Sequence, residues 1–138
     1  MAEGLEKMQR FYDELLSDGN FDVIDEIVAD DIVDHEAMPD QPEGKDGVRW
    51  FIELLRAGFS DIKVTMGPAL ESGDLASAQF TITAKHTGEF MGVPASAKQI
   101  EIETIDIVRV ADGKCAEHWG VTDMLALLQQ IGAVPAAA

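Results

Sequence analysis

Residues 100–123, IEIETIDIVRVADGKCAEHWGVTD, decide the fold. Apolar and polar side chains alternate from residue 100 to residue 110, which is the period of a β-strand with one buried face. Asp112-Gly113 follows, a dipeptide typical of a two-residue hairpin turn, and Lys114–Asp123 has the composition of the returning strand. The stretch therefore predicts an antiparallel hairpin.

The register of this hairpin predicts which side chains share its buried face. A two-residue turn places Asp106 opposite Trp119 and Ile102 opposite Asp123. The two aspartates would then lie roughly 13 Å apart at about 3.3 Å per residue, a separation that suits opposite ends of one small-molecule pocket. The apolar members of this face are Ile100, Ile102, Val108, Val110, Cys115, Trp119 and Val121.

Asp106 and Asp123 are candidate acid/base residues because a carboxyl group among apolar side chains has a raised pKa. Each also has a purely structural interpretation. Asp123 precedes a predicted helix and is a favoured helix N-cap. Asp106 could be a buried acceptor for the indole N–H of Trp119. The sequence leaves these alternatives open.

The rest of the chain completes an α+β domain that spans residues 1–138. Apolar residues at helical spacing predict three N-terminal helices, and period-two alternation predicts two further strands before the hairpin. The fold class expected is therefore three helices packed on one face of a four-stranded antiparallel sheet. The predicted segments are helices at 3–17, Phe21–Val28, Lys45–Phe59 and Met124–Ile131, a short extended segment at Asp31–His35, loops at Glu36–Gly44 and Gly88–Ala97, and strands at Asp61–Ser72 and Ala76–Thr87.

Composition excludes several classes of partner. The chain has 138 residues with 26 acidic and 10 basic side chains, a formal net charge of −16, so we expect no binding to nucleic acid or to a membrane surface. The single cysteine, Cys115, excludes an intramolecular disulfide and a cysteine-rich zinc site. No signal peptide, metal-ligand spacing or cofactor motif is recognised, so we expect a cytoplasmic protein without metal or cofactor.

The three histidines differ in their sequence surroundings. His86 ends an apolar stripe, where a lone histidine is more often a packed core residue than a catalyst. His35 follows Asp34 at the start of the loop that contains two prolines. His118 alternates with Trp119, so the predicted register turns it outward.

The order of several short motifs resembles the SnoaL-like polyketide cyclases, within the nuclear transport factor 2-like and ketosteroid isomerase-like superfamily. Together the motifs span nearly the whole chain, and residues 106–132 are the most specific part. The motifs are Phe11-Tyr12, Ser17–Asn20, Asp34-His35, Gly58–Asp61, Lys85–Pro94, Asp106–Lys114, Glu117–Asp123 and Gln129–Gly132.

The resemblance implies a cone-shaped α+β barrel with a strongly curved antiparallel sheet, a deep apolar pocket and a homodimer through the outer sheet face. It implies cofactor-free aldol cyclisation of a hydrophobic carbonyl compound. The family's tryptophan–x–x–x–aspartate motif falls on Trp119 and Asp123, which makes Asp123 the expected acid/base residue. His35 and His86 match positions near the pocket that could polarise a carbonyl or orient the substrate.

The ketosteroid isomerase-like branch implies a different assignment. There, Tyr12 and Asp106 would form the oxyanion hole. The catalytic base would fall near His35-Glu36, where the chain lacks the expected aspartate and Glu36 could replace it. Pro94–Ala97 also departs from the glycine-containing turn of the cyclases.

The sequence thus predicts an enzyme that performs general acid/base chemistry in an apolar pocket. The alternative is a non-catalytic small-molecule-binding module, or a dimeric interaction module whose outer sheet face carries Ile105 and Ile107. The candidate catalytic residues are Asp123, His35, His86 and Asp106, and the candidate substrate contacts are Tyr12, Trp119, Trp50, Phe90 and Met38.

Overall fold

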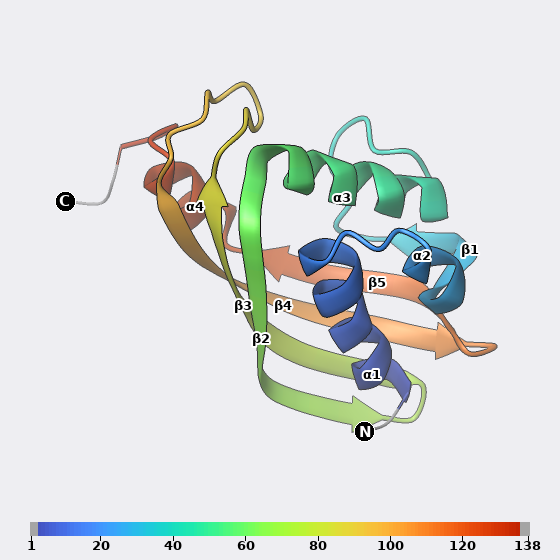
Figure 1. Cartoon of the computed structure of the whole chain (residues 1–138). Coiled ribbons are helices and arrows are strands. Elements are labelled where there is room, and N and C mark those ends of the chain that lie inside the picture. Colours follow the sequence, from blue (N-terminus) through green and yellow to red (C-terminus); the bar gives the residue numbers. More distant parts are fainter. Residues whose placement is uncertain (1–2, 136–138) are drawn as a thin grey trace.

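A computed structural model describes residues 3–135 of the chain as helices followed by a sheet (Figure 1). The predicted helices and strands are all present, with ends that differ by a few residues. Helix α1 continues without a break into π-helical turns, η1. The elements are α1 Glu3–Arg10, η1 Phe11–Ser17, α2 Val23–Ile27, β1 Val28–Asp34, α3 Lys45–Gly58, β2 Phe59–Ser72, β3 Leu75–His86, β4 Gln99–Ala111, β5 Lys114–Thr122 and α4 Met124–Gln130.

The sheet has five strands in the order β1-β5-β4-β3-β2. Strands β2 to β5 form the expected antiparallel meander, but β1 is a fifth strand that pairs parallel to β5. The prediction of a four-stranded, purely antiparallel sheet is therefore wrong, and the sheet is not strongly curled. The sequence VADDIVD shows no clean alternation, and its partner lies more than eighty residues further along the chain, so local patterns could not reveal the pairing.

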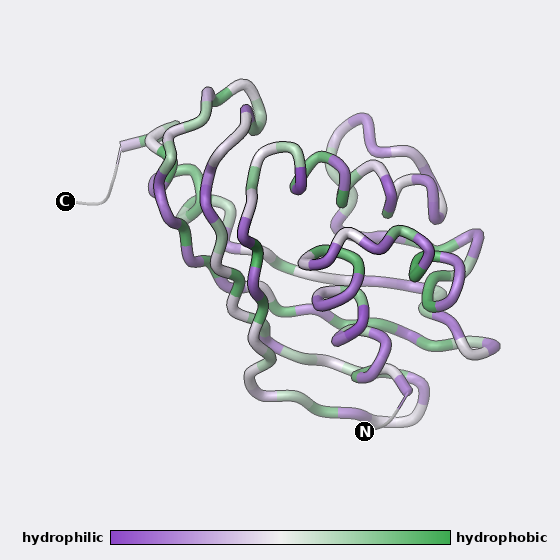
Figure 2. The backbone as a smooth tube through the Cα atoms, in the orientation of Figure 1, coloured by the Kyte–Doolittle hydropathy of each residue, from purple (hydrophilic) through white to green (hydrophobic). Residues whose placement is uncertain are grey.

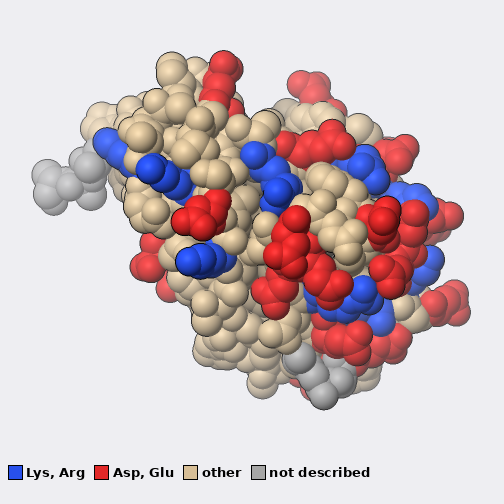
Figure 3. All heavy atoms as spheres, viewed as in Figure 1, with Lys and Arg blue, Asp and Glu red and all other residues tan. Residues whose placement is uncertain are grey.

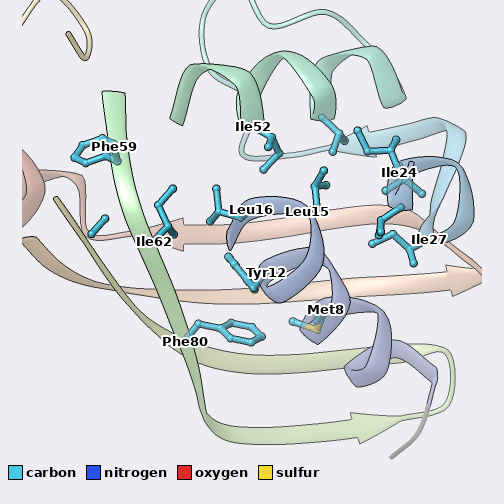
Figure 4. Packing of buried hydrophobic residues seen from close by; sticks show 14 of the residues in the cluster. Met8, Tyr12, Leu15, Leu16, Ile24, Ile27, Ile52, Phe59, Ile62 and Phe80 are labelled. Atoms are coloured by element: carbon cyan, nitrogen blue, oxygen red, sulfur yellow. The ribbon is translucent and has the colours of Figure 1, made fainter. Parts of the chain in front are cut away.

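The helices cover one face of the sheet and enclose the core (Figure 1). Leu15 of η1 and Ile52 of α3 are fully buried, and the Tyr12 ring packs 4.3 Å from the ring of Phe80 on β3. Figure 4 shows these side chains directed into the space between the helices and the sheet. In the backbone trace, most of α1 is hydrophilic, and hydrophobic residues alternate with hydrophilic ones along the helices and the strands (Figure 2).

Acidic side chains gather over the helical side of the face seen in Figure 3. Several are paired: Lys45 lies 2.7 Å from Asp25 and 2.9 Å from Asp30, and Arg10 lies 2.8 Å from Glu14. Within residues 3–135, no helix is long and apolar enough to cross a membrane.

A β-bulge in the β4–β5 hairpin changes the predicted register. Val110 pairs with Cys115 as expected, but Arg109 pairs with Glu117, so Ala116 is an extra residue on β5. Beyond the bulge every β5 side chain is turned to the opposite face from the one predicted. The predicted pairings of Asp106 with Trp119 and of Ile102 with Asp123 are therefore wrong, and Asp106 lies opposite Gly120.

The same shift reverses the predicted faces of two aromatic residues. Trp119 pairs with Ile107 on the outer face, where its ring stacks on His35 with centroids 5.0 Å apart. His118, predicted to point outward, lines the cavity between helices and sheet. The alternation of β4 is unaffected, since Ile100, Ile102, Thr104, Asp106 and Val108 are all buried.

Candidate active site

A cavity of about 410 Å³ lies between the helices and the inner face of the sheet. Most of its wall is apolar, supplied by side chains of α1, η1, α3, the strands and α4. Apart from Lys7 of α1, its polar wall residues gather where η1, the end of β1, β4 and β5 meet. The residues of this polar cluster are Tyr12, Asp34, Glu36, Gln41, Thr104, Asp106, His118 and Thr122.

His118 is the centre of the polar cluster. Its Nε2 lies 2.8 Å from Asp106 Oδ1, and its Nδ1 lies 2.8 Å from Asp34 Oδ1. Burial by itself lowers the pKa of His118, but the hydrogen bonds to Asp106 and Asp34 outweigh burial and raise this pKa to about 10. At neutral pH the ring is therefore an imidazolium that donates one hydrogen bond to each carboxylate.

Tyr12 supplies a neutral donor to the same carboxylate. Its hydroxyl donates to Asp106 Oδ2 over 2.5 Å. Burial, together with the negative charge of Asp106, raises the pKa of Tyr12 well above its usual value, so the phenol keeps its proton. Both oxygens of Asp106 are therefore engaged, and the buried carboxylate is compensated by a charge and by a hydroxyl.

Asp34 ties His118 to the loop that follows β1. Besides His118, its Oδ1 accepts the backbone N–H of Glu36 over 2.9 Å, and its Oδ2 accepts the side-chain amide of Gln41 over 3.2 Å. Burial raises the pKa of Asp34, but the hydrogen bonds from His118 and the Glu36 backbone outweigh burial and lower this pKa below the ordinary aspartate value. The loop therefore depends on an ionised Asp34.

Glu36 is the carboxylate of the polar cluster that has one oxygen available to a bound molecule. Its Oε2 accepts the Thr122 hydroxyl over 2.9 Å. Its Oε1 lies 4.0 Å from His118 Nε2 and accepts no hydrogen bond from residues 3–135. Burial, with the negative charge of Asp106 adding to it, raises the pKa of Glu36, which suits a group that takes up and returns a proton.

Gly120 makes room for Glu36. A Cβ at residue 120 would lie 2.5 Å from Glu36 Oε1 and 2.7 Å from Asp106 Oδ1, closer than non-bonded atoms approach. Because Gly120 lies opposite Asp106 on β5, any side chain there would enter the cluster. The position of Glu36 therefore requires a glycine on the neighbouring strand.

Four of the nine predicted site residues line the cavity. Asp106 and Tyr12 belong to the polar cluster, and Phe90 and Met38 form part of the wall. Trp50 lies half-buried on α3 and Trp119 lies on the outer face, and neither belongs to the wall. The structure thus brings Tyr12 and Asp106 together as the isomerase-like resemblance implied.

The other predicted acid/base residues lie elsewhere. The Asp123 side chain caps α4 by accepting the Ala126 backbone N–H over 3.0 Å, and it lies outside the cavity wall. His35 is exposed and contacts Glu117 over 2.6 Å on the outer face. His86 is fully buried behind the wall, with its Nδ1 accepting the Ser96 backbone N–H over 3.1 Å.

Sequence reasoning missed Asp34, Gln41 and the inward side of His118. Asp34 is the last residue of β1, and Gln41 lies in the loop that follows. No local sequence pattern predicts the path of that loop. The adjacent Asp34-His35-Glu36 triplet was the signal available for Glu36. For His118 the only signal was the residue type, histidine. The bulge that turns it inward lies two residues earlier and leaves no trace in the alternation of β5.

Residues 6–131 match the family of SnoaL-like polyketide cyclases. The chain belongs to this family. Aklanonic acid methyl ester cyclase DauD from Streptomyces sp. (strain C5) is 25% identical over 122 residues, which cover 86% of this chain and 76% of DauD. The resemblance predicted from the sequence is therefore confirmed.

Solved structures of bacterial proteins share this fold over nearly the whole chain. TsrD from Streptomyces laurentii superposes with a TM-score of 0.85 at 27% identity and covers 94% of this chain and 95% of its own. IdmH from Streptomyces antibioticus gives a TM-score of 0.79 at 28% identity and covers 93% of this chain and 97% of its own. The nuclear transport factor 2-like arrangement of helices on a sheet is thus shared with these proteins.

The raised pKa of His118 predicts that stability falls as the solution becomes alkaline. The folded protein holds a proton that the unfolded chain releases near pH 6.5, so this stabilisation is complete below pH 6.5 and is lost as pH rises through about 10. Between pH 7 and pH 8.5 the free energy of unfolding should fall by up to about 1.4 kcal/mol per pH unit. Urea titrations at several pH values measure this slope.

His118→Gln should abolish the slope, and His35→Gln should retain it. The window ends at pH 8.5 because burial raises the pKa of the Cys115 thiol to about 11, which adds a separate dependence at higher pH. A wild-type stability that is constant from pH 7 to pH 8.5 would contradict the assigned charge of His118.

Proposed function

We propose that this protein is an enzyme that moves a proton at a carbon next to a carbonyl group, in an aldol cyclisation of a hydrophobic substrate. The observation that carries the proposal is the free Oε1 of Glu36 in a largely apolar cavity, 4.0 Å from the imidazolium of His118. An apolar wall selects a hydrophobic compound, and a few convergent polar groups orient it.

Glu36 acts as the base that removes the acidic proton of the bound substrate. The carbanion so formed attacks a second carbonyl carbon of the same molecule, and a carbon–carbon bond forms as the carbonyl π bond becomes an alkoxide. Glu36, now protonated, returns its proton to that alkoxide, so the carboxylate is regenerated and the ring-closed product is neutral. The raised pKa of Glu36 suits both transfers.

His118 and Asp34 prepare the site for the developing negative charge. The imidazolium places a positive charge beside Glu36, and a fixed charge in a site of low polarity stabilises an enolate more strongly than water does. Asp34 holds the ring through Nδ1, so the ring does not have to reorient during the reaction. Asp34 is therefore a positioning residue.

Family membership supports a cyclase-type reaction. DauD carries the name of an aklanonic acid methyl ester cyclase, and the aligned sequence extends over 86% of this chain and 76% of DauD. The second candidate function is isomerisation, since Tyr12 and Asp106, the pair implied by the isomerase-like branch, both line the cavity. The Tyr12 hydroxyl donates to Asp106 in this structure and would have to turn to the substrate oxygen in that reaction. Both reactions begin with the same proton transfer.

Hydrogen–deuterium exchange at carbon tests the proposal directly. Wild-type protein should catalyse exchange at the acidic carbon of one or more hydrophobic β-keto esters or 3-keto steroids, followed by NMR in deuterium oxide. Glu36→Gln, which keeps the hydrogen-bonding shape but cannot accept the proton, should lower the rate by about 100-fold or more. Asp123→Asn, which keeps the cap of α4, should exchange at the wild-type rate.

The exchanging compound distinguishes the two reactions, since a β-keto ester favours cyclisation and a 3-keto steroid favours isomerisation. Equal rates for Glu36→Gln and wild type would remove Glu36 from the chemistry. Loss of exchange in Asp123→Asn instead would return the acid/base role to the residue that the family motif implied. A protein that binds these compounds without exchange would be a binding module.

We further propose a homodimer through the outer sheet face. Two cross-strand pairs, Ile105 with Val121 and Ile107 with Trp119, place adjacent apolar side chains on that face, and Val121 is 77% exposed. A dimer that buries them should appear in sedimentation at micromolar concentration, and the double change Ile105→Glu and Val121→Glu should yield a folded monomer. A wild-type monomer under these conditions would exclude the interface.

A further inference from the structure

Three side-chain atoms of metal-ligand type converge in the polar cluster. They are Glu36 Oε1 from the loop after β1, Asp106 Oδ1 from β4 and His118 Nε2 from β5, and all lie within 4.8 Å of one another. His118 Nε2 is 2.8 Å from Asp106 and 4.0 Å from Glu36. Ligands bound 2.0–2.2 Å from one tetrahedral ion lie about 3.3–3.6 Å from each other, a separation between these two distances.

The three atoms border a common space that exists because residue 120 is glycine. A Cβ built on Gly120 would lie 2.5 Å from Glu36 Oε1, 2.7 Å from Asp106 Oδ1 and 3.0 Å from His118 Nε2. Ligand atoms of three different segments therefore point toward one region of the cavity, on the side of Gly120 that a side chain would fill.

Neighbouring side chains orient each of the three candidate ligands. Asp34 accepts from the other ring nitrogen of His118, Thr122 donates to the second oxygen of Glu36, and Tyr12 donates to the second oxygen of Asp106. A carboxylate behind a metal-binding histidine and hydrogen bonds behind metal-binding carboxylates are the outer contacts that fix a metal site.

The charge of the cluster also favours a cation. Asp34, Glu36 and Asp106 bring three carboxyl groups to a largely apolar cavity, and His118 is the basic residue that contacts them, since Lys7, the other basic residue of the wall, pairs with Glu3. One imidazole with two carboxylates suits a divalent transition-metal ion such as zinc or manganese better than calcium or magnesium, which prefer oxygen ligands alone. Three protein ligands leave the remaining coordination position for water or a substrate oxygen.

We propose that Glu36, Asp106 and His118 bind one divalent transition-metal ion, for which zinc is the probe. The ion replaces the Nε2 proton that His118 shares with Asp106, and the proton leaves to solvent. Because the ion also takes Glu36 as a ligand, the metal-bound protein cannot use Glu36 as a base. This effect on activity, but not the binding itself, rests on the proposed function.

Calorimetric titration of the metal-free protein with zinc tests the site. Wild type should bind one zinc ion per chain, and cobalt bound in its place should give visible absorption bands of a protein-bound ion. Glu36→Gln and His118→Ala should each weaken zinc binding at least tenfold. Gly120→Ala keeps all three ligands but fills their common space, and it should weaken binding by a similar factor. His35→Ala, which removes an exposed histidine on the other face, should leave binding unchanged.

The outcomes separate the site from the proposed function. Absence of saturable zinc binding by wild type, or equal binding by Glu36→Gln and His118→Ala, would overturn the metal site. Deuterium exchange is measured in parallel with EDTA and with saturating zinc, and zinc should suppress the rate at least tenfold. Exchange in EDTA without any zinc binding would leave the proposed function intact and reject the metal site alone.

Discussion

The extra residue Ala116 in β5 is the constraint on which the candidate site depends. It shifts the hairpin register by one residue and thereby turns His118 inward, opposite Val108 and beside Asp106. Without that shift, Trp119 and not His118 would face the cavity. Asp106 would then be a buried carboxylate without its compensating charge, which a protein interior tolerates poorly.

The positions of the other polar groups depend on this contact between His118 and Asp106. The imidazolium of His118 needs a second carboxylate at Nδ1, which Asp34 provides from the end of β1. Asp34 in turn fixes the start of the loop by accepting the Glu36 backbone N–H. Glu36 is thereby placed beside Gly120, with one oxygen held by Thr122 and the other facing the cavity. The parallel pairing of β1 with β5 is what brings the loop to the hairpin.

Local patterns in the sequence predicted the elements and the strand faces up to the bulge. The alternation in 100–110 placed Asp106 on the buried face correctly, because that strand is regular. Asp123 was correctly predicted to precede a helix, and its side chain makes the N-cap hydrogen bond expected at that position. The bulge at Ala116 and the parallel strand Val28–Asp34 depend on pairing between distant segments, which no local period records. The family resemblance placed Tyr12 beside Asp106, as the structure does. Its tryptophan–x–x–x–aspartate motif, however, singled out Asp123, which lies outside the cavity wall.

The site depends on His118 being an inward-facing imidazolium held between Asp106 and Asp34. Nitrogen-15 NMR of the histidine rings of wild-type protein tests it most directly, with His118→Gln used to assign the signal. Both His118 ring nitrogens should carry protons at pH 8, and one proton should be lost only as the pH approaches about 10. A neutral ring at pH 8 that titrates near the ordinary histidine pKa of about 6.5 would contradict it.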